Sequence, residues 1–404
     1  MPRRAIVCGG SIGGLFAALF LHRSGWEVEV LERVEVELSG RGAGIVTHDL
    51  LNRLIAATGA SIEDLGVAVA ERVVFDKSGG TVSHTPMPQV VTSWDRVHGL
   101  LRAQMPEGSY RLGRAVTGYT DGPDAVTVHL DDGSTLQADL LIGGDGFRSA
   151  IRAQMLPEVQ PTYAGYVVWR ALAHEADLSA RVRAEVFPHF ALYAPTGTQI
   201  VGYPIAGPGN DLRPGHRRYN FVWYVPVAPD KLPAMLTDGK GHTHAISIPP
   251  PLVRPEVMAE GVRLAEALLP PQFTEILAKS EAPFFTPIYD HISPTFAQGR
   301  VAMVGDAACV ARPHVGMGVT KAACDAEALA RHLAAPLSVP EALAAYSAER
   351  QPAGLFAVET ARRLGTYIFI TPDDGDNADG RDNPNIQAII HETAVVPAAL
   401  AAAG

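Results

Sequence analysis

The chain has 404 residues, of which 47% are hydrophobic, so it is long enough to bury one large core or the core of two interleaved domains. Its 33 basic and 43 acidic residues give a formal net charge of −10 and are spread along the chain. The Lys/Arg blocks that attract nucleic acids or anionic membranes are absent, so neither is an expected partner.

The first third of the chain alternates strand-like and helical patterns. Ala5–Cys8 and Glu27–Leu31 predict buried strands, and Ile12–Arg23 between them predicts a helix, which is the order of a parallel β-α-β unit. Glycines interrupt the apolar run near the N-terminus, so a strand, a turn and a helix explain it better than an export signal does.

The middle of the chain is rich in strand patterns. Ala125–Leu130 and Thr135–Ile142 predict a hairpin, with its turn at residues 131–133. A separate, mostly antiparallel sheet is indicated by three β-rich runs among Pro/Gly turns: Tyr163–Leu172, Ala191–Ile205 and Tyr219–Val227. After these runs, Val301–Val304 predicts a buried strand, and Thr320–Leu333 and Pro340–Leu364 predict long helices.

These elements predict an α/β fold with a discontinuous Rossmann-like nucleotide-binding domain, formed by residues 1–160 and 283–335. The mostly antiparallel β-sheet inserted between them, residues 161–282, is the expected substrate domain. Residues 336–370 form a C-terminal helical segment, and 371–404 are expected to be a loosely packed tail. The three cysteines show neither disulfide nor metal-ligand spacing, and no apolar run reaches the roughly 18 residues of a membrane span. We therefore expect a cytoplasmic protein without a metal.

The first predicted strand runs into Gly-Gly-Ser-Ile-Gly-Gly at residues 9–14, where a dinucleotide fold has Gly-x-Gly-x-x-Gly. Gly9 permits the tight turn, Gly14 permits close packing of helix and strand, and the helix N-terminus attracts a pyrophosphate. Glu32, at the end of the second strand, is placed to bind ribose hydroxyls. Ser11 replaces the middle glycine but adds only a small side chain. A glycine-rich loop without a ligand is the alternative, and the strand-helix-strand context argues against it.

Two further strand-to-turn segments each carry a carboxylate at the strand end. One runs from Asp139 into Gly-Asp-Gly at 144–146, and the other runs from Arg300 into Gly305-Asp306-Ala307-Ala308. Each carboxylate can accept hydrogen bonds from sugar or ribitol hydroxyls. The glycine-rich helix start at 316–318 can donate backbone N–H groups to a flavin carbonyl.

With these three ordered segments, the sequence resembles the class A flavoprotein monooxygenases of the para-hydroxybenzoate hydroxylase type, over roughly residues 3–365. Within that family it is most similar to the 2,6-dihydroxypyridine 3-hydroxylases, on residues 161–170, on the run Arg312-Pro313-His314 and on Ser11 in the first segment. Two departures stand out. Trp94 occupies the position of a usual arginine, which puts one phosphate contact in doubt, and Cys309 stands where many members have histidine.

The resemblance implies one bound FAD and a transiently bound NADH or NADPH. Residues 9–14 would hold the pyrophosphate, Glu32 the adenosine ribose, Asp306 the ribitol chain, and residues 316–318 the flavin N1 and C2 carbonyl. Residues 41–44 match a loop beside the flavin. In chain order, the implied cofactor-binding residues are Gly9, Ser11, Ile12, Gly13, Gly14, Glu32, Arg33, Arg41, Gly42, Gly44, Asp145, Asp306, Gly316, Met317 and Gly318.

The chemistry implied by the resemblance is that reduced FAD and dioxygen form a C4a-hydroperoxide, which an electron-rich ring attacks. The protein must exclude water and help to ionise a ring hydroxyl. Pro313 would line the pocket near the flavin, and the candidates for the ionisation are His48, His314, Tyr203 and Tyr224. Each has a plainer interpretation, as a surface histidine or a packing aromatic. We assign Arg170 to bracing the interface between sheet and cofactor domain, and Cys309 to packing.

We therefore expect an FAD- and NAD(P)H-dependent hydroxylase of a small aromatic ring, in particular a hydroxypyridine, with dioxygen as co-substrate. A homodimer is compatible with the sequence. The motifs describe cofactor geometry and not ring chemistry, so epoxidation, N-hydroxylation and Baeyer–Villiger oxidation remain alternatives. A flavin-binding sensor without turnover is the alternative outside the enzymes. Only one glycine-rich β-α-β unit is present, which disfavours a two-dinucleotide reductase.

Overall fold

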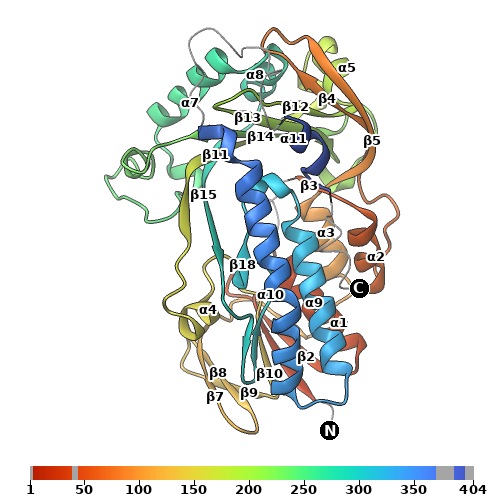
Figure 1. The fold of residues 1–404 in the computed structure, drawn as a ribbon, viewed down its shortest axis with the longest axis vertical. Helices are drawn as coiled ribbons and strands as arrows, with labels where there is room; N and C mark the ends of the chain where they lie inside the picture. The colour runs from red at the N-terminus through yellow and green to blue at the C-terminus, as the bar shows by residue number, and fades with distance from the viewer. Residues whose placement is uncertain (1–2, 39–43, 370–385, 396–404) are drawn as a thin grey trace.

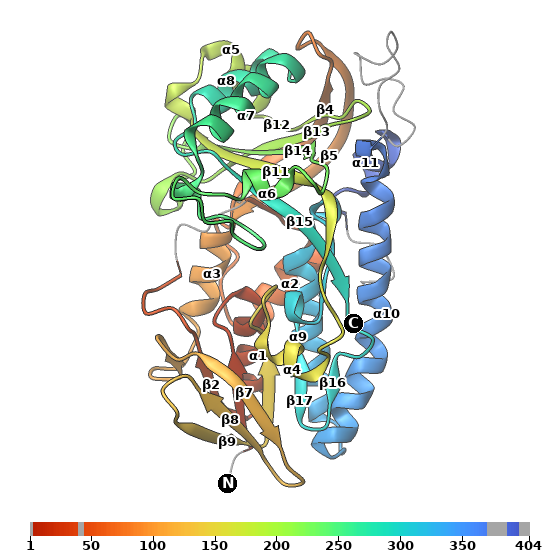
Figure 2. The ribbon, with the colours of Figure 1, turned by 90° about the vertical axis from the view of Figure 1, so that its left-hand side faces the viewer.

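The computed structural model describes residues 3–38, 44–369 and 386–395. Within these residues the strands form a six-stranded, a nine-stranded and a three-stranded sheet (Figure 1). The molecule is elongated, with the six-stranded sheet towards one end and the nine-stranded sheet towards the other (Figure 2). The three-stranded sheet consists of β7 (Val116–Asp121), β8 (Val126–Leu130) and β9 (Thr135–Ala138).

The six-stranded sheet is the centre of the nucleotide-binding half. Its order is β16 (Ala297–Gln298), β17 (Val301–Met303), β10 (Leu140–Gly143), β1 (Arg4–Cys8), β2 (Glu27–Leu31) and β6 (Tyr110–Arg111). β1 is parallel to β2 and β10, and β17 joins β10 in parallel from far along the chain. This pairing confirms the predicted discontinuous Rossmann-like fold.

The nine-stranded sheet is mostly antiparallel, as predicted, with one parallel pair between β12 and β4. Its order is β18 (Cys309–Val310), β15 (Phe284–Ile292), β11 (Thr162–His174), β14 (Arg218–Pro226), β13 (Gln199–Ile205), β12 (His189–Tyr193), β4 (Val67–Phe75), β5 (Thr81–Ser93) and β3 (Gly44–Val46).

Sheet membership departs from the expected domain boundaries. β3, β4, β5, β15 and β18 lie outside residues 161–282 but pair into the nine-stranded sheet. β5 was missed because much of it is partly exposed and it carries Pro86 and Pro88, so it lacks the regular apolar alternation of a strand. The single strand expected over Thr135–Ile142 is two strands in different sheets, since β9 pairs with β8 and β10 pairs with β1.

The helices cover the sheets in two groups. α5 (Ala180–Val186), α7 (Pro255–Leu268) and α8 (Pro271–Ala278) pack on one face of the nine-stranded sheet (Figures 1 and 2). The core of the nucleotide-binding half includes buried side chains of α1 (Ile12–Arg23) and α9 (Gly318–Ala334). In the described residues, four further helices precede α9: α2 (Asp49–Ala57), α3 (Trp94–Arg102), α4 (Ala150–Met155) and α6 (Leu232–Met235).

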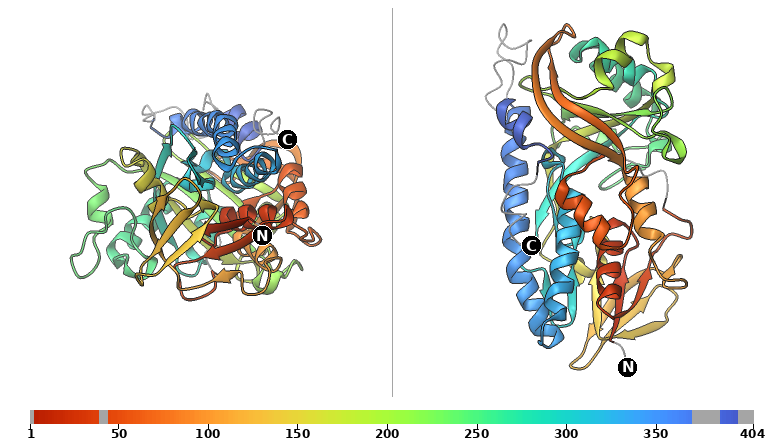
Figure 3. Two further views of the ribbon diagram at one scale, coloured as in Figure 1. Left: turned by 90° about the horizontal axis from the view of Figure 1, so that it is seen from below. Right: turned by 90° about the vertical axis from the view of Figure 1, so that its right-hand side faces the viewer.

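The C-terminal region joins the two ends of the molecule. α10 (Val339–Leu364) begins with a capping box between Ser338 and Glu341 and runs along the side of the molecule (Figures 2 and 3). α11 (Ile386–Glu392) then packs on the nine-stranded sheet, with Ile389 and Ile390 each 1% exposed. The expected loose packing of 371–404 is therefore wrong for 386–395, and the rest of that tail lies outside the described residues. No helix in the described part of the chain is long and apolar enough to cross a bilayer.

Candidate active site

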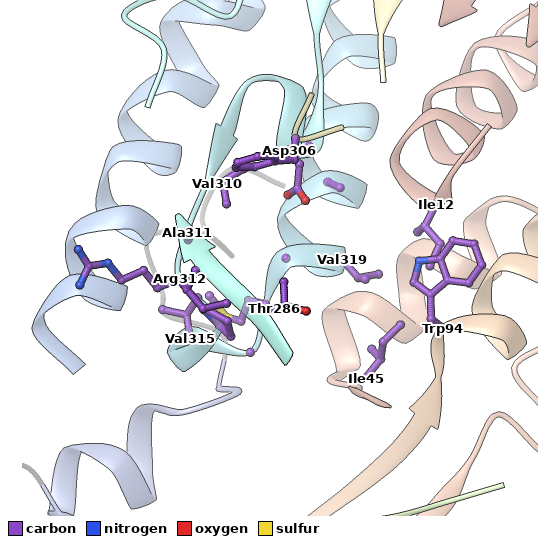
Figure 4. Close-up of a pocket in the computed structure, with 18 of the residues that line it drawn as sticks. Ile12, Ile45, Trp94, Thr286, Asp306, Val310, Ala311, Arg312, Val315 and Val319 are labelled. Atoms are coloured by element: carbon purple, nitrogen blue, oxygen red, sulfur yellow. The ribbon is translucent and has the colours of Figure 1, made fainter. Parts of the chain in front are cut away.

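A cavity of about 610 Å³ lies where the two large sheets approach each other. Residues from the turn after β1, from the start of α9 and from 393–394 line it, together with one face of the nine-stranded sheet. That face is called the cavity face below, and its lining side chains are Arg170, Phe190, Val201, Tyr203, Val222, Tyr224, Thr286 and Ile288. Figure 4 shows the Asp306 carboxylate directed into the space between Val310 and Ile12.

The turn after β1 has the geometry that a diphosphate requires. Gly9 has a φ of +100°, and a Cβ at this position would lie 2.5 Å from the carbonyl oxygen of Gly144. A Cβ on Gly14 would collide with the carbonyl oxygen of Gly9. Ser11 is the N-cap of α1, so the first N–H groups of the helix have no acceptor within it, and Ser11, Ile12 and Gly13 line the cavity. These residues fit the pyrophosphate of FAD.

Glu32 lies at the end of β2, as predicted, and is 6% exposed. Its Oε2 accepts a hydrogen bond from Gly10 N at 2.8 Å, and its Oε1 accepts one from Val34 N at 3.1 Å. Each oxygen keeps a lone pair that a ribose hydroxyl can use. The neighbouring Arg33 is exposed.

The predicted flavin loop is described only in part. Arg41 and Gly42 lie outside the described residues. Gly44 lines the cavity and donates its backbone N–H to Asn220 Oδ1 at 3.2 Å. A Cβ at Gly44 would meet the ring of Tyr203, so glycine permits the close approach of this loop to the cavity face.

The two predicted strand-end carboxylates point in different directions. Asp306 lines the cavity, and desolvation by the surrounding protein raises its pKa. Asp145 instead accepts hydrogen bonds from Ala150 N and Ile151 N at 2.7 and 3.3 Å, so that it caps α4. Its neighbours Gly144 and Gly146 line the cavity. Asp306 therefore fits the ribitol chain, whereas Asp145 shapes the turn beside it.

The start of α9 provides the predicted N–H donors at Met317 and Gly318, whereas the Gly316 N–H donates to the carbonyl oxygen of Pro313 at 2.8 Å. Gly316 has a φ of +61°, Met317 is the N-cap, and a Cβ on Gly318 would meet no neighbouring atom. All three residues line the cavity, as does Pro313. A 17-residue helix that begins at a cavity wall can stabilise negative charge at a flavin carbonyl.

Residues 393–394 close the cavity beside this helix start, which the sequence did not indicate. Ala394 donates its N–H to the Val315 carbonyl at 2.9 Å. Its carbonyl oxygen accepts from Gln89 Nε2 at 3.1 Å and contacts His48 Nε2 at 2.8 Å. The fully buried Arg72 donates to the Ile390 carbonyl at 2.6 Å, which holds α11 in place.

His48 is half-buried at the N-cap of α2, directly behind the cavity wall. A carbonyl oxygen can only accept, so Nε2 carries the proton that it donates to Ala394. In the neutral ring, Nδ1 then carries a lone pair, and this nitrogen lies 3.4 Å from the hydroxyl oxygen of Thr320. Thr320 lines the cavity. Burial lowers the pKa of His48, so the ring is neutral at pH 7 and Nδ1 keeps its lone pair.

The structure does not bring His314 into the cavity. The ring is 1% exposed and stacks on Tyr224 with centroids 4.5 Å apart. Nδ1 lies 2.9 Å from Gln199 Oε1, which also accepts from the Tyr367 hydroxyl. Burial lowers the pKa of His314 to about 3. His314 therefore supports Tyr224 from behind and does not face the cavity.

This burial predicts a pH-dependent stability. As the pH is lowered below 6.5, His314 becomes protonated in the unfolded chain, whereas in the folded chain it stays neutral down to about pH 3. The free energy of unfolding therefore decreases as the pH is lowered from 6.5 to about 3. The contribution is about 1.4 kcal/mol per pH unit. The measurement is the free energy of unfolding in urea at several pH values between 6 and 4. Plotted against pH, this free energy should have a shallower slope for His314→Gln than for the wild type. Two results would contradict the assignment. One is a slope for His314→Gln equal to that of the wild type, and the other is an equally shallow slope for the exposed control His22→Gln.

Tyr203 and Tyr224 both line the cavity, as predicted. They are 5% and 3% exposed, and burial raises the pKa of both hydroxyls. At neutral pH both are therefore hydrogen-bond donors and not bases. Arg170 also lines the cavity, which corrects its assignment to interface bracing. Strand alternation could have shown this, because Tyr166, Val168 and Arg170 share one face of β11.

Trp94, at the usual arginine position, stacks on His98 with centroids 4.6 Å apart and lines the cavity near Ile12 (Figure 4). His98 Nε2 lies 3.1 Å from the carbonyl oxygen of Gly10. An aromatic pair therefore covers the glycine turn here.

Comparisons with known proteins agree with this site. A family model described as FAD binding domain matches residues 275–361, and one described as FAD binding domain-like matches residues 163–290. The 2,6-dihydroxypyridine 3-monooxygenase of Paenarthrobacter nicotinovorans is 32% identical over 330 residues, which cover 81% of this chain and 82% of the relative. The chain belongs to the class A FAD-dependent aromatic monooxygenases.

Solved structures place this monooxygenase in the same fold. The 2,6-dihydroxypyridine-3-hydroxylase from Arthrobacter nicotinovorans superposes with a TM-score of 0.86 at 28% identity, over 94% of this chain and 96% of that one. Klebsiella pneumoniae HpxO complexed with FAD and uric acid superposes with a TM-score of 0.76 at 23% identity, over 97% and 92% of the two chains. The family assignment from sequence is confirmed, and the cofactor of this monooxygenase is FAD.

Proposed function

We propose that this monooxygenase hydroxylates a hydroxypyridine, with NADH or NADPH as the electron donor. The observation that carries the proposal is the composition of the cavity. The predicted flavin-binding elements form one wall. The other wall combines apolar side chains with two tyrosines, Thr286 and one cationic side chain, Arg170. The similarity to 2,6-dihydroxypyridine hydroxylase, in sequence and in structure, supports this ring as the substrate class.

The 9–14 turn, Asp306 and the start of α9 would hold FAD, which when bound would supply the chemistry of hydride acceptance and dioxygen activation. The protein orients the ring: Val201, Val222 and Ile288 provide apolar contacts, and the neutral hydroxyls of Tyr203 and Tyr224 donate hydrogen bonds to ring oxygens. The packed 393–394 segment helps to keep water out.

His48 is the group that we assign to proton removal. Its lone pair at Nδ1 faces the Thr320 hydroxyl, and that hydroxyl can accept a proton from a ring O–H while passing its own to Nδ1. The ring oxygen then carries negative charge, which raises electron density at the carbon to be hydroxylated. His314 has no part in this step, because its ring lies behind Tyr224.

The test is a substrate panel with the purified holoenzyme. Hydroxypyridines, phenols, unhydroxylated pyridine, ketones and alkenes are assayed for stimulated NADH and NADPH oxidation and for a product that has gained one oxygen atom. We expect stimulation and product with hydroxypyridines and neither with pyridine. Product only from ketones or alkenes would replace the proposal by Baeyer–Villiger oxidation or epoxidation. Absence of turnover with every compound would favour a flavin-binding sensor.

A further inference from the structure

Arg170 places a positive charge in the middle of the cavity face. It lies on β11, between β14 and β15, and its register partners are Val222 and Phe284. The preceding residue, Trp169, packs in the core on the opposite face of the sheet, under α7 and α8. Arg170 is half-buried, and a charge in such a position is costly unless something compensates it.

Among the described residues, Arg170 differs from the other arginines that line the cavity. Arg312 donates to Asp290 Oδ2 at 2.6 Å, and the exposed Arg148 donates to Ser247 Oγ at 2.9 Å. The guanidinium of Arg170 forms neither a hydrogen bond nor an ion pair with any described residue. Asp306, the acidic side chain on the cavity wall, interacts with Lys321 and Arg152 instead.

The charge of Arg170 acts on two hydrogen-bond donors of the cavity face, Tyr203 and Tyr224. The positive charge of Arg170 acts on both Tyr203 and Tyr224 and favours their ionisation, but burial has the larger, opposite effect and keeps both hydroxyls protonated. A guanidinium and two phenol hydroxyls on one wall together provide charge and several N–H and O–H donors. Such a set is complementary to an oxygen anion and not to a neutral ring.

We infer that Arg170 binds the ionised oxygen of the aromatic substrate. The substrate class is then an aromatic ring that carries an acidic hydroxyl, and this inference rests on the proposed hydroxylase function. When the ring O–H bond breaks, its electron pair stays on the oxygen beside Arg170, and the proton leaves through Thr320 to His48 Nδ1. No oxidation or reduction occurs in this step. Arg170 lowers the ring hydroxyl's pKa, and His48 receives the proton.

The experiment measures binding to the oxidised holoenzyme without NAD(P)H and without oxygen. The probe is 2,6-dihydroxypyridine, at a pH one unit below its own first pKa, and both its affinity and the ultraviolet spectrum of the bound ligand are recorded. The wild type should bind the ionised form, which absorbs at longer wavelength. Arg170→Gln and Arg170→Met should weaken binding about 10-fold or more and should bind the neutral form, with the flavin content unchanged. Arg170→Lys should recover part of the affinity. The control Arg181→Gln, at an exposed arginine on α5 outside the cavity, should stay within about twofold of the wild type.

Each outcome decides the inference. Wild-type affinity in Arg170→Gln and Arg170→Met would overturn it and leave the hydroxylase proposal standing. The inference is also overturned, with the hydroxylase proposal intact, if the wild type hydroxylates a hydroxypyridine that it binds only in the neutral form. This measurement needs no variant, so it tests the inference even if both variants fail to fold. If the wild type neither binds nor hydroxylates any hydroxypyridine or phenol, the proposed function fails, and the inference fails with it.

Discussion

Replacing Gly9 by alanine is expected to abolish FAD retention, and with it all substrate-stimulated NAD(P)H oxidation. The alanine would have to adopt a φ of +100°, and its Cβ would lie 2.5 Å from the carbonyl oxygen of Gly144. Both obstacles are backbone features that no side-chain rotation relieves. Displacing the turn moves the N-terminus of α1, where the pyrophosphate binds. The measurement is the ratio of FAD to protein after gel filtration, followed by reconstitution with excess FAD.

A matched control separates the collision from the backbone strain. Gly25 has a φ of +87°, but a Cβ there would have no neighbour within 4 Å. Gly25→Ala should therefore lose about 1 kcal/mol of stability and keep its FAD. If Gly9→Ala folds and binds FAD as tightly as the wild type, the 9–14 turn does not hold the cofactor. Release of FMN instead of FAD from the wild type would equally contradict the assignment of this turn and Glu32.

Replacing His48 by alanine is expected to lower coupled hydroxylation by roughly 10²- to 10⁴-fold, the usual range for general acid–base help. The ring would still bind, but its hydroxyl would lose the path through Thr320 to a neutral histidine. Oxygen would then be reduced without hydroxylation of the ring, so hydrogen peroxide should form in place of the hydroxylated product. The measurement is the amount of product and of hydrogen peroxide per NAD(P)H consumed.

Two further variants test the route of the proton. Thr320→Val should reproduce the uncoupling, because it removes the hydroxyl between the cavity and Nδ1. His22→Ala, an exposed histidine in the last turn of α1, should behave as the wild type does. FAD retention should be unchanged in all of these variants. Full coupling in His48→Ala would assign proton removal to another group and leave His48 as the anchor of the Ala394 carbonyl.

The sequence by itself determined the cofactor half of this protein. Strand β2 and helix α1 have the predicted limits, and the glycines at 9 and 14 occupy the positions where the backbone leaves no room for a side chain. These features are local, because a tight turn, a helix start and a strand-end carboxylate are each encoded within about 20 residues. Asp306 and Gly316–Gly318 were found for the same reason.

Only the tertiary structure decided which wall each catalytic candidate faces. His48 and Ala394 are 346 positions apart, and His314 and Gln199 are 115 apart, so no local pattern could reveal that one histidine lies behind Thr320 and the other behind Tyr224. The pairing of three strands had to place Arg170 on the same face of the sheet as Tyr203 and Tyr224. The packing of 386–395 depends on Ile389 and Ile390 finding a distant apolar surface, which the composition of the tail does not show. Burial, not residue type, sets the protonation state of these groups, and burial is a property of the folded chain.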